Sequence, residues 1–293
     1  MQRVNPLLTA VHAQFGYASE DGFVAKVVDA SFTVWPGQIM VLVGPNGGGK
    51  TTLVRGILGQ SAILGGALKR ISPDAVHPLC IRYVSQRSQA GFLGDTVGDE
   101  LWMAMPSEQD WQRVRDILAE VGLTVSLETR VTRLSGGQMQ LLALAVALLH
   151  NPHVLVVDEG TSMLASESRQ RVVDCILQRV QERSMALVWV TQQLEDIAFA
   201  HEVVVMDAGR LIWQGTPHAF FYGDCPSDWN VEGTLLAADC RKAETPCRRL
   251  GFTPPTVIQI GEQLAARGFS PSELPLHYED ILRGWESHTW QSN

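Results

Sequence analysis

The chain opens with hydrophobic residues that alternate with polar ones and continues with runs that are apolar throughout. Alternation predicts strands with one buried face, and it is found in residues 7–15, 24–28 and 30–34. A turn-rich stretch at 16–22 separates the first of these segments from the second. Ile39–Val43 is apolar at every position, which is typical of a strand buried on both faces. The sequence therefore predicts an antiparallel sheet that leads into a buried strand.

Apolar residues recur at helical spacing through the middle of the chain. We expect a helical region from Thr96 to about Val121 and, behind a Ser135 cap, a helix from Gly136 to about His150. Strands and helices then alternate as far as residue 206, which predicts a mostly parallel, doubly wound α/β sheet. The remaining expected elements are a loop and short strand at 61–70, strands at 80–84, 154–157 and 186–190, helices at 167–182 and 194–200, and a hairpin of 203–206 with 211–213.

The character of the sequence changes near residue 222. Residues 223–249 are interrupted by proline and glycine and show little periodicity, which predicts a linker. Apolar spacing then indicates two short helices, around 257–264 and 281–285. The expected domains are 1–221, with a helical subdomain at about 87–150, and 222–293.

The composition disfavours some classes of protein. With 23 basic and 31 acidic residues the chain carries a formal charge of −8, which argues against the basic face of a nucleic-acid binder. The five cysteines lack metal-ligand spacing, so zinc is disfavoured and reduced thiols in a cytosolic protein are expected. The longest strongly apolar run, 141–149, is well short of the ~20 residues that span a bilayer, and no secretory signal is visible. Any membrane role is therefore expected to come through a partner.

Residues 44–52 carry the clearest chemical signal. They match the phosphate-loop pattern G-x-x-x-x-G-K-[ST] between an expected strand and an expected helix. The glycines let successive N–H groups point at an anion, and the helix N-terminus adds partial positive charge. Lys50 is expected to reach the β- and γ-phosphates, and the Thr51 hydroxyl to ligate Mg²⁺. The nucleotide-binding residues predicted here are Gly44, Pro45, Asn46, Gly47, Gly48, Gly49, Lys50, Thr51 and Thr52.

Three further features point to the same chemistry. Residues 134–138, LSGGQ, start a helix with a serine cap and two glycines, whose open N–H groups can bind a phosphate. Asp158 and Glu159 follow an apolar strand, at the carboxyl end where ligands bind. Asp158 is expected to hold Mg²⁺, and Glu159 to polarise the attacking water as general base. Gln86 follows another strand, from which its side chain can reach the Mg²⁺ and the γ-phosphate.

In this order and spacing the phosphate loop, Gln86, LSGGQ and the Asp-Glu pair resemble the ATPase subunits of ABC transporters, over about residues 7–220. The resemblance implies a P-loop NTPase fold with an N-terminal antiparallel β subdomain, a parallel core sheet, a helical subdomain and a small C-terminal helical extension. It implies ATP and Mg²⁺ as cofactors. Tyr17 would stack on adenine, although a core aromatic at a strand end is a nearly equal interpretation. Two chains of this family pack head to tail, so the residues contacting the partner's ATP would be Ser135, Gly136, Gly137 and Gln138.

Shorter stretches are similar to the energy-coupling factor ATPases of that family, which drive uptake of vitamins and of cobalt or nickel ions. These stretches are 89–92, 96–100, 161–164, 250–264 and 268–269. The resemblance implies an ATP-hydrolysing subunit at the cytoplasmic face of the cell membrane, working with a second ATPase and a transmembrane component. The transmembrane component would dock near residues 86–105, and the C-terminal extension would contribute to pairing of the ATPases. It does not name the transported substrate.

Three positions depart from the family pattern. Gln192 stands where the family has its switch histidine; it can donate a hydrogen bond to a γ-phosphate but carries no titratable proton. Ala165 replaces an aspartate, and Leu141 an arginine. Either the chain pairs with an unlike ATPase that carries the complete set, which we favour, or both sites work slowly. A degenerate regulatory subunit with little hydrolysis is the alternative function. The expected catalytic residues are Glu159, Gln192 and Gln86.

Overall fold

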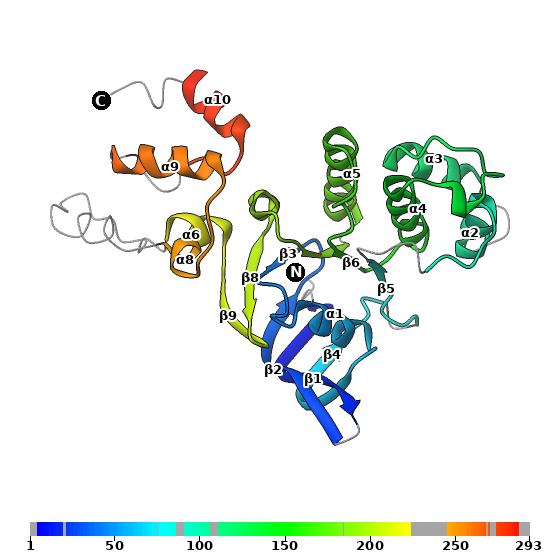
Figure 1. Ribbon diagram of the computed structural model, residues 1–293, viewed down its shortest axis with the longest axis horizontal. Coiled ribbons are helices and arrows are strands. Elements are labelled where there is room, and N and C mark those ends of the chain that lie inside the picture. The colour runs from blue at the N-terminus through cyan, green and yellow to red at the C-terminus, as the bar shows by residue number, and fades with distance from the viewer. Residues whose placement is uncertain are drawn as a thin grey trace. The chain divides into compact units, whose positions relative to one another are not determined.

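The structure is a computed structural model that describes residues 5–19, 22–74, 76–85, 91–105, 111–183, 185–223, 245–267, 269 and 274–286. Within these residues the strands form one nine-stranded sheet in the order β4-β1-β2-β9-β8-β3-β7-β6-β5 (Figure 1). The strands are β1 Leu8–Ser19, β2 Gly22–Val34, β3 Ile39–Val43, β4 Ala62–Arg70, β5 Ile81–Val84, β6 Val154–Asp158, β7 Ala186–Val190, β8 Glu202–Asp207 and β9 Arg210–Gly215. The helices are α1 Lys50–Leu58, α2 Val97–Ala104, α3 Trp111–Val121, α4 Gly136–Leu149, α5 Ser166–Arg183, α6 Pro217–Tyr222, α8 Pro246–Arg249, α9 Thr256–Ala266 and α10 Tyr278–Glu286, with 3-10 turns η2 Val131–Arg133 and η3 Leu194–Phe199.

The sheet has an antiparallel part and a parallel part. β1 pairs antiparallel with both β2 and β4. β3, β7, β6 and β5 run parallel to one another. Every residue of β3 and β7 is buried, because helices and neighbouring strands leave these central strands no solvent face. The α/β fold class predicted from the sequence is confirmed.

The chain divides into two compact units. The first comprises Met1–Gln192 and Val205–Ile212, and the second comprises Gln193–Val204 and Trp213–Asn293. The division at residue 221 that the sequence suggested stays a prediction. Each unit is described by itself below.

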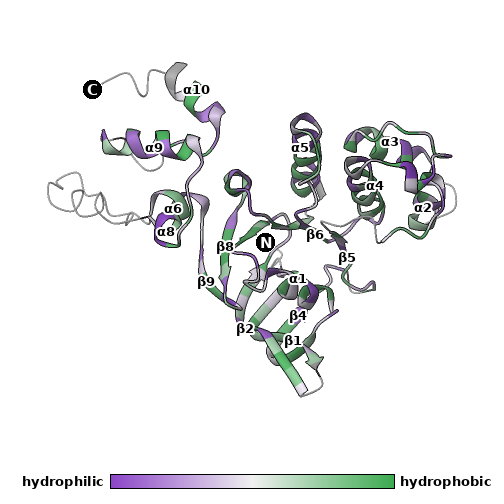
Figure 2. Ribbon diagram, viewed as in Figure 1, coloured by the Kyte–Doolittle hydropathy of each residue, from purple (hydrophilic) through white to green (hydrophobic). Residues whose placement is uncertain are grey.

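The helices of the first unit fall into groups. α2 and α3 both contact α4, and α5 contacts α3 (Figure 1). α5 carries hydrophobic and hydrophilic residues side by side, as a helix with one covered face does (Figure 2). An ion pair between Arg179 of α5 and Glu120 of α3 links the two helices. Across the described chain, no helix has both the length and the apolar character needed to cross a membrane.

The second unit has a small aromatic core. Phe220 of α6 contacts the rings of Trp213 and Phe252, with centroids 5.2 and 5.9 Å away. Gly261 of α9 lies against Tyr222, and a Cβ at this glycine would be 2.1 Å from the tyrosine hydroxyl oxygen. α9 can therefore approach α6 this closely only with glycine at position 261.

Two strand predictions were too short. β1 continues to Ser19 and β2 begins at Gly22, so the turn expected over 16–22 is narrower. β4 fills 62–70, where we expected a loop and a short strand because of Gly65 and Gly66. The two glycines lie at an irregularity of the β1–β4 ladder, where Gly66 has φ of +67° and a Cβ would meet the His12 carbonyl oxygen at 2.1 Å. The glycines permit a bulge and do not end the strand.

The helices of the structure also differ in detail from those predicted. The helical region expected from Thr96 to about Val121 contains α2 and α3, and residues 106–110 lie outside the described chain. The helix expected at 194–200 is a 3-10 turn. The expected linker contains α8, which starts with a Thr245 cap and Pro246. Four residues are too few to show periodicity, so only these start signals could have revealed α8.

Candidate active site

The phosphate loop joins the end of β3 to the start of α1. Gly44 has φ of +149°, and a Cβ there would lie 2.0 Å from the Met206 carbonyl oxygen, so only glycine fits beside β8. Gly49 is the N-cap of α1, with φ of +108° and no side chain to accept from the first N–H groups. These donors and the positive end of the helix therefore remain available for an anion.

Lys50 opens α1 and is only 7% exposed. Its Nζ donates to the carbonyl oxygens of Gly44 at 2.7 Å and Pro45 at 2.9 Å. Burial lowers the pKa of Lys50, and the carboxylates of Glu159 and Asp158 act in the opposite direction. The ammonium thus donates hydrogen bonds to the phosphate loop itself, within reach of the space that a phosphate would occupy.

A cleft of about 480 Å³ brings most of the predicted site together. We call it the nucleotide cleft. Its walls come from the phosphate loop, from β1 and β2, and from the ends of β6 and β7. The lining residues are Tyr17, Lys26, Asn46, Gly47, Gly49, Lys50, Thr51, Thr52, Asp158, Glu159 and Gln192.

Tyr17 lies at the β1 side of the nucleotide cleft and is 50% exposed. A side chain this open is placed to stack on a base and is not part of the core. The stacking role stays a prediction, and the geometry favours it over the core interpretation.

Asp158 ends β6 beside Tyr83 of β5. The Tyr83 hydroxyl donates to Asp158 Oδ2 at 3.1 Å. Burial raises the pKa of Asp158, the Tyr83 hydrogen bond opposes this shift, and the Glu159 carboxylate adds to it. Sequence reasoning missed Tyr83, because its contact depends on the pairing of β5 with β6. One carboxylate oxygen of Asp158 is thereby oriented, and oxygen ligands from Asp158 and Thr51 suit Mg²⁺.

Glu159 has a backbone φ of +50°, a region that side-chain-bearing residues rarely adopt. Its N–H donates to the Val190 carbonyl at the end of β7 at 3.0 Å, which holds it beside that strand. Gln192 Nε2 donates to Glu159 Oε1 at 2.5 Å and to Asn46 Oδ1 at 3.2 Å. Gln192 therefore links the predicted base to the phosphate loop.

The LSGGQ segment forms the start of α4 and does not line the nucleotide cleft of its own chain. Ser135 and Gln138 form a capping box, with Ser135 Oγ accepting from the Gln138 N–H at 3.2 Å and Gln138 Oε1 from the Ser135 N–H at 2.9 Å. Gly136 and Gly137 lie against Met163: added Cβ atoms would meet its Sδ at 3.0 Å and its carbonyl oxygen at 3.3 Å. The capping box and the contacts with Met163 thus fix the conformation of this helix start, and its binding role stays a prediction.

The other predicted site residues have simple placements. Gly44, Pro45 and Gly48 form the loop without lining the cleft, and the Gly48 carbonyl accepts from the Gly209 N–H at 2.8 Å. Gln86 lies outside the described residues. Lys26 lines the cleft although no motif included it.

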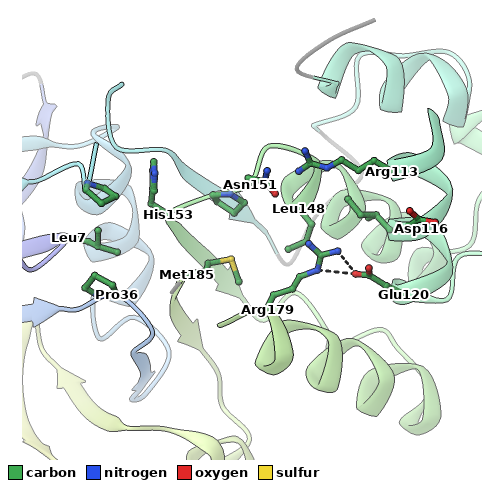
Figure 3. Close-up of a pocket in the computed structure, with 13 residues that line it drawn as sticks. Leu7, Pro36, Arg113, Asp116, Glu120, Leu148, Asn151, His153, Arg179 and Met185 are labelled. Carbon is green, nitrogen blue, oxygen red and sulfur yellow. Dashed lines mark hydrogen bonds and ion pairs between the residues drawn. The ribbon is translucent and has the colours of Figure 1, made fainter. Parts of the chain in front are cut away.

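A second, larger hollow of about 660 Å³ opens at the amino ends of β3, β6 and β7. We call it the basal cavity; Figure 3 shows Arg179 pointing across it to Glu120. None of the predicted site residues lines it. Its lining consists of Leu7, Pro36, Pro73, Arg113, Asp116, Ile117, Glu120, Leu148, Asn151, Pro152, His153, Arg179 and Met185.

Known proteins resemble this chain over most of its length. A family model described as ABC transporter matches residues 27–162. The energy-coupling factor transporter ATP-binding protein EcfA1 of Levilactobacillus brevis is 30% identical over 260 residues, covering 85% of this chain and 92% of that protein. The protein of the same name from Lactobacillus delbrueckii subsp. bulgaricus is 31% identical over 297 residues, covering 96% of each.

A solved structure supports the fold. That of cbiO1 from Clostridium perfringens, part of the ABC transporter complex cbiONQ, matches with a TM-score of 0.62 at 21% identity and covers 74% of this chain and 91% of that one. The relatives align with most of this chain, and the cleft is lined by six of the nine predicted phosphate-loop residues and by both residues of the Asp-Glu pair. This chain belongs to the energy-coupling factor ATP-binding proteins of the ABC transporter family.

Proposed function

We propose that this chain is the ATP-hydrolysing subunit of an importer of the energy-coupling factor type. In this role, ATP-driven closure of an ATPase dimer is coupled to substrate uptake through a transmembrane partner. One observation carries the proposal: Lys50, Asp158 and Glu159 converge in one cleft at the carboxyl ends of parallel strands.

The residues of the cleft divide the chemistry among them. Tyr17 would hold the adenine, and the N–H groups of the phosphate loop would hold the triphosphate. Lys50 would exchange its two carbonyl partners for phosphate oxygens. Glu159 would take the proton of the attacking water, once the hydrogen bond from Gln192 turns from Glu159 toward the γ-phosphate. The Gln192 contact thus holds the base in a resting position until ATP arrives.

Thr51 and Asp158 are the residues that would hold Mg²⁺. Mg²⁺ bound there would offset the phosphate charge. The Tyr83 hydroxyl occupies Asp158 Oδ2 and fixes the direction of the carboxylate toward the cleft.

We propose further that the LSGGQ segment completes the ATP site of a second ATPase. The capped, exposed start of α4 supports this role, because it offers backbone donors that its own cleft does not use. Gln192 and Ala165 favour an unlike partner that carries the complete set of family residues. The complex would lie at the cytoplasmic face of the membrane, and purifying this chain from membranes would identify both partners.

ATP hydrolysis by the Glu159→Gln variant tests the proposed function. Removing the general base should lower turnover at least ~100-fold while ATP binding persists. Glu128→Gln, which alters an exposed glutamate away from the cleft, is the matched control and should hydrolyse ATP normally. Unchanged turnover in Glu159→Gln would overturn the proposal that this chain is the ATP-hydrolysing subunit.

A further inference from the structure

Lys26 of β2 lines the nucleotide cleft together with Tyr17, Asn46 and Gly49. The residue is exposed, and within the described residues its ammonium group takes part in no ion pair and no side-chain hydrogen bond. It belongs to none of the motifs from which the site was predicted. The cleft therefore holds a cation whose role the motifs leave open.

The β1–β2 ladder has an irregularity at this residue. Phe15 pairs with Val27, and the next residue of β1, Gly16, pairs with Ala25. β2 thus has one residue more than β1 at this point, and the extra residue is Lys26. A bulge of this kind interrupts the alternation of side chains and can re-aim one of them beside a ligand site.

Backbone contacts fix Lys26 beside the phosphate loop. A Cβ at Gly49 would lie 3.3 Å from the Lys26 carbonyl oxygen, and a Cβ at Gly209 would lie 2.3 Å from it. Gly209 donates its N–H to the Gly48 carbonyl at 2.8 Å and accepts from the Val28 N–H at 2.8 Å. The turn at Gly209 thereby ties β2 to the loop, so the Lys26 side chain starts from a fixed position.

The position of Lys26 along the cleft selects the part of the nucleotide that it can reach. Tyr17, at the adenine end, pairs with Val24, two residues before Lys26. Glu159 and Gln192 lie at the end where the γ-phosphate would be hydrolysed. Between these ends lie the ribose and the α- and β-phosphates, and of these only the phosphates, which ATP and ADP share, carry the negative charge that an ammonium group pairs with.

The charge balance of the cleft explains how the Lys26 ammonium would favour nucleotide binding. Two carboxylates, Asp158 and Glu159, face two ammonium groups, Lys50 and Lys26. Without Lys26 the lining would carry one net negative charge, which would oppose binding of a polyanion. Gln192 cannot compensate, because its amide is uncharged.

We propose that Lys26 is a further nucleotide-binding residue whose ammonium pairs with the α- or β-phosphate of ATP and ADP alike. The inference rests on the proposed function, since it assumes that the cleft binds ATP. Because the contact exists before and after hydrolysis, it strengthens the binding of substrate and product equally. It lowers KM and leaves the rate of the chemical step unchanged.

Binding measurements on the full chain test this role. In Lys26→Met, which keeps the length of the side chain, the affinities for ATP and ADP should both fall about five- to thirtyfold, as expected for loss of one charge-assisted hydrogen bond. Adenosine should bind as it does to the unaltered chain, and Lys26→Arg should retain most of the affinity. Lys69→Met is the matched control, because Lys69 is an exposed lysine of the same antiparallel sheet and does not line the cleft.

Three results would overturn the inference. Unchanged ATP and ADP affinities in Lys26→Met would show that the ammonium makes no phosphate contact. An equal loss for adenosine would assign the contact to the nucleoside instead. Failure of the unaltered chain to bind ATP at all would overturn the proposed function, and this inference with it.

Discussion

The nucleotide cleft and the basal cavity lie at opposite ends of the same parallel strands, and they differ in chemistry more than in size. The basal cavity is the larger, at about 660 Å³ against about 480 Å³. Its arginines are already engaged: Arg179 with Glu120, and Arg113 with the Leu149 carbonyl at 2.8 Å. The cleft instead receives the uncapped start of α1. Unused donors, and not volume, distinguish the binding site.

Strand direction explains this difference. At the carboxyl end of β3 the chain turns into the N-terminus of α1, which is the positive end of a helix. At the amino end of β6 the chain arrives from the C-terminus of α4, where the Leu149 carbonyl accepts a hydrogen bond from Arg113. One edge of the sheet therefore attracts anions, while the other edge uses its own cations to satisfy carbonyl oxygens and carboxylates.

Removing Lys50 should have the largest effect. Lys50→Ala should weaken ATP binding by about 100-fold, or about 2.7 kcal/mol, because a buried charged donor to phosphate is lost. Titration with a fluorescent ATP analogue measures this. Arg179→Met removes a cation of the basal cavity and should leave ATP affinity unchanged; a comparable loss in that variant would refute the distinction between the two hollows.

Removing Arg179 should affect stability and not chemistry. Arg179 is 7% exposed at its side chain, and Glu120 is 45% exposed. Arg179→Met should lower the free energy of unfolding by about 1–2 kcal/mol, because the helix contact is lost while Glu120 can regain water. Urea denaturation measures the change. Adding Glu120→Gln should recover part of it, and no recovery would mean that the two side chains do not interact.

Changing Gln192 should alter ATP turnover less than removing Glu159 does. Gln192→His should raise ATP turnover about three- to tenfold and add a pH dependence near neutrality, because a titratable ring replaces the amide that now holds Glu159. Steady-state rates between pH 6 and 8 measure both effects. The neighbouring substitution Gln193→His is the control, and an equal gain there would remove the special role of position 192.

The smallest effect concerns pH and His150, the C-cap residue of α4. Burial, and then Arg82 and Arg113, lower the pKa of His150 below its usual 6.5. Well above pH 6.5 the side chain is neutral in both the folded and unfolded states. Below it the unfolded chain takes up the proton first, so stability should fall with falling pH until the lowered pKa is reached.

His150→Asn should flatten that acid loss of stability, as urea midpoints at pH 5.5 and 7.5 would show. His201→Asn, which alters an exposed histidine, is the control. If the pH dependence of stability were unchanged in His150→Asn, the acid loss of stability would not come from His150.

Much of the cleft could be predicted because its motifs are local in sequence. The phosphate loop and the Asp158–Glu159 pair each follow a short apolar strand, so their place at the carboxyl edge follows from strand direction alone. Tyr83 and Lys26 could not be found in this way. The contact of Tyr83 depends on which strand lies beside β6, and the direction of Lys26 depends on a register shift between β1 and β2. The sequence of one strand does not by itself specify which strand pairs with it or in which register.

The same limit applies to the basal cavity. Its lining comes from segments as distant in sequence as Leu7 and Met185, none of which carries a motif. Only the fold brings them together, and only their mutual contacts show that their charges are satisfied.

Photolabelling with an ATP analogue that carries an azide on its adenine ring shows whether ATP binds in the nucleotide cleft. We expect an adduct in β1, on or beside Tyr17, that disappears in Lys50→Ala. An adduct on α3 or α5, around the basal cavity, would contradict it.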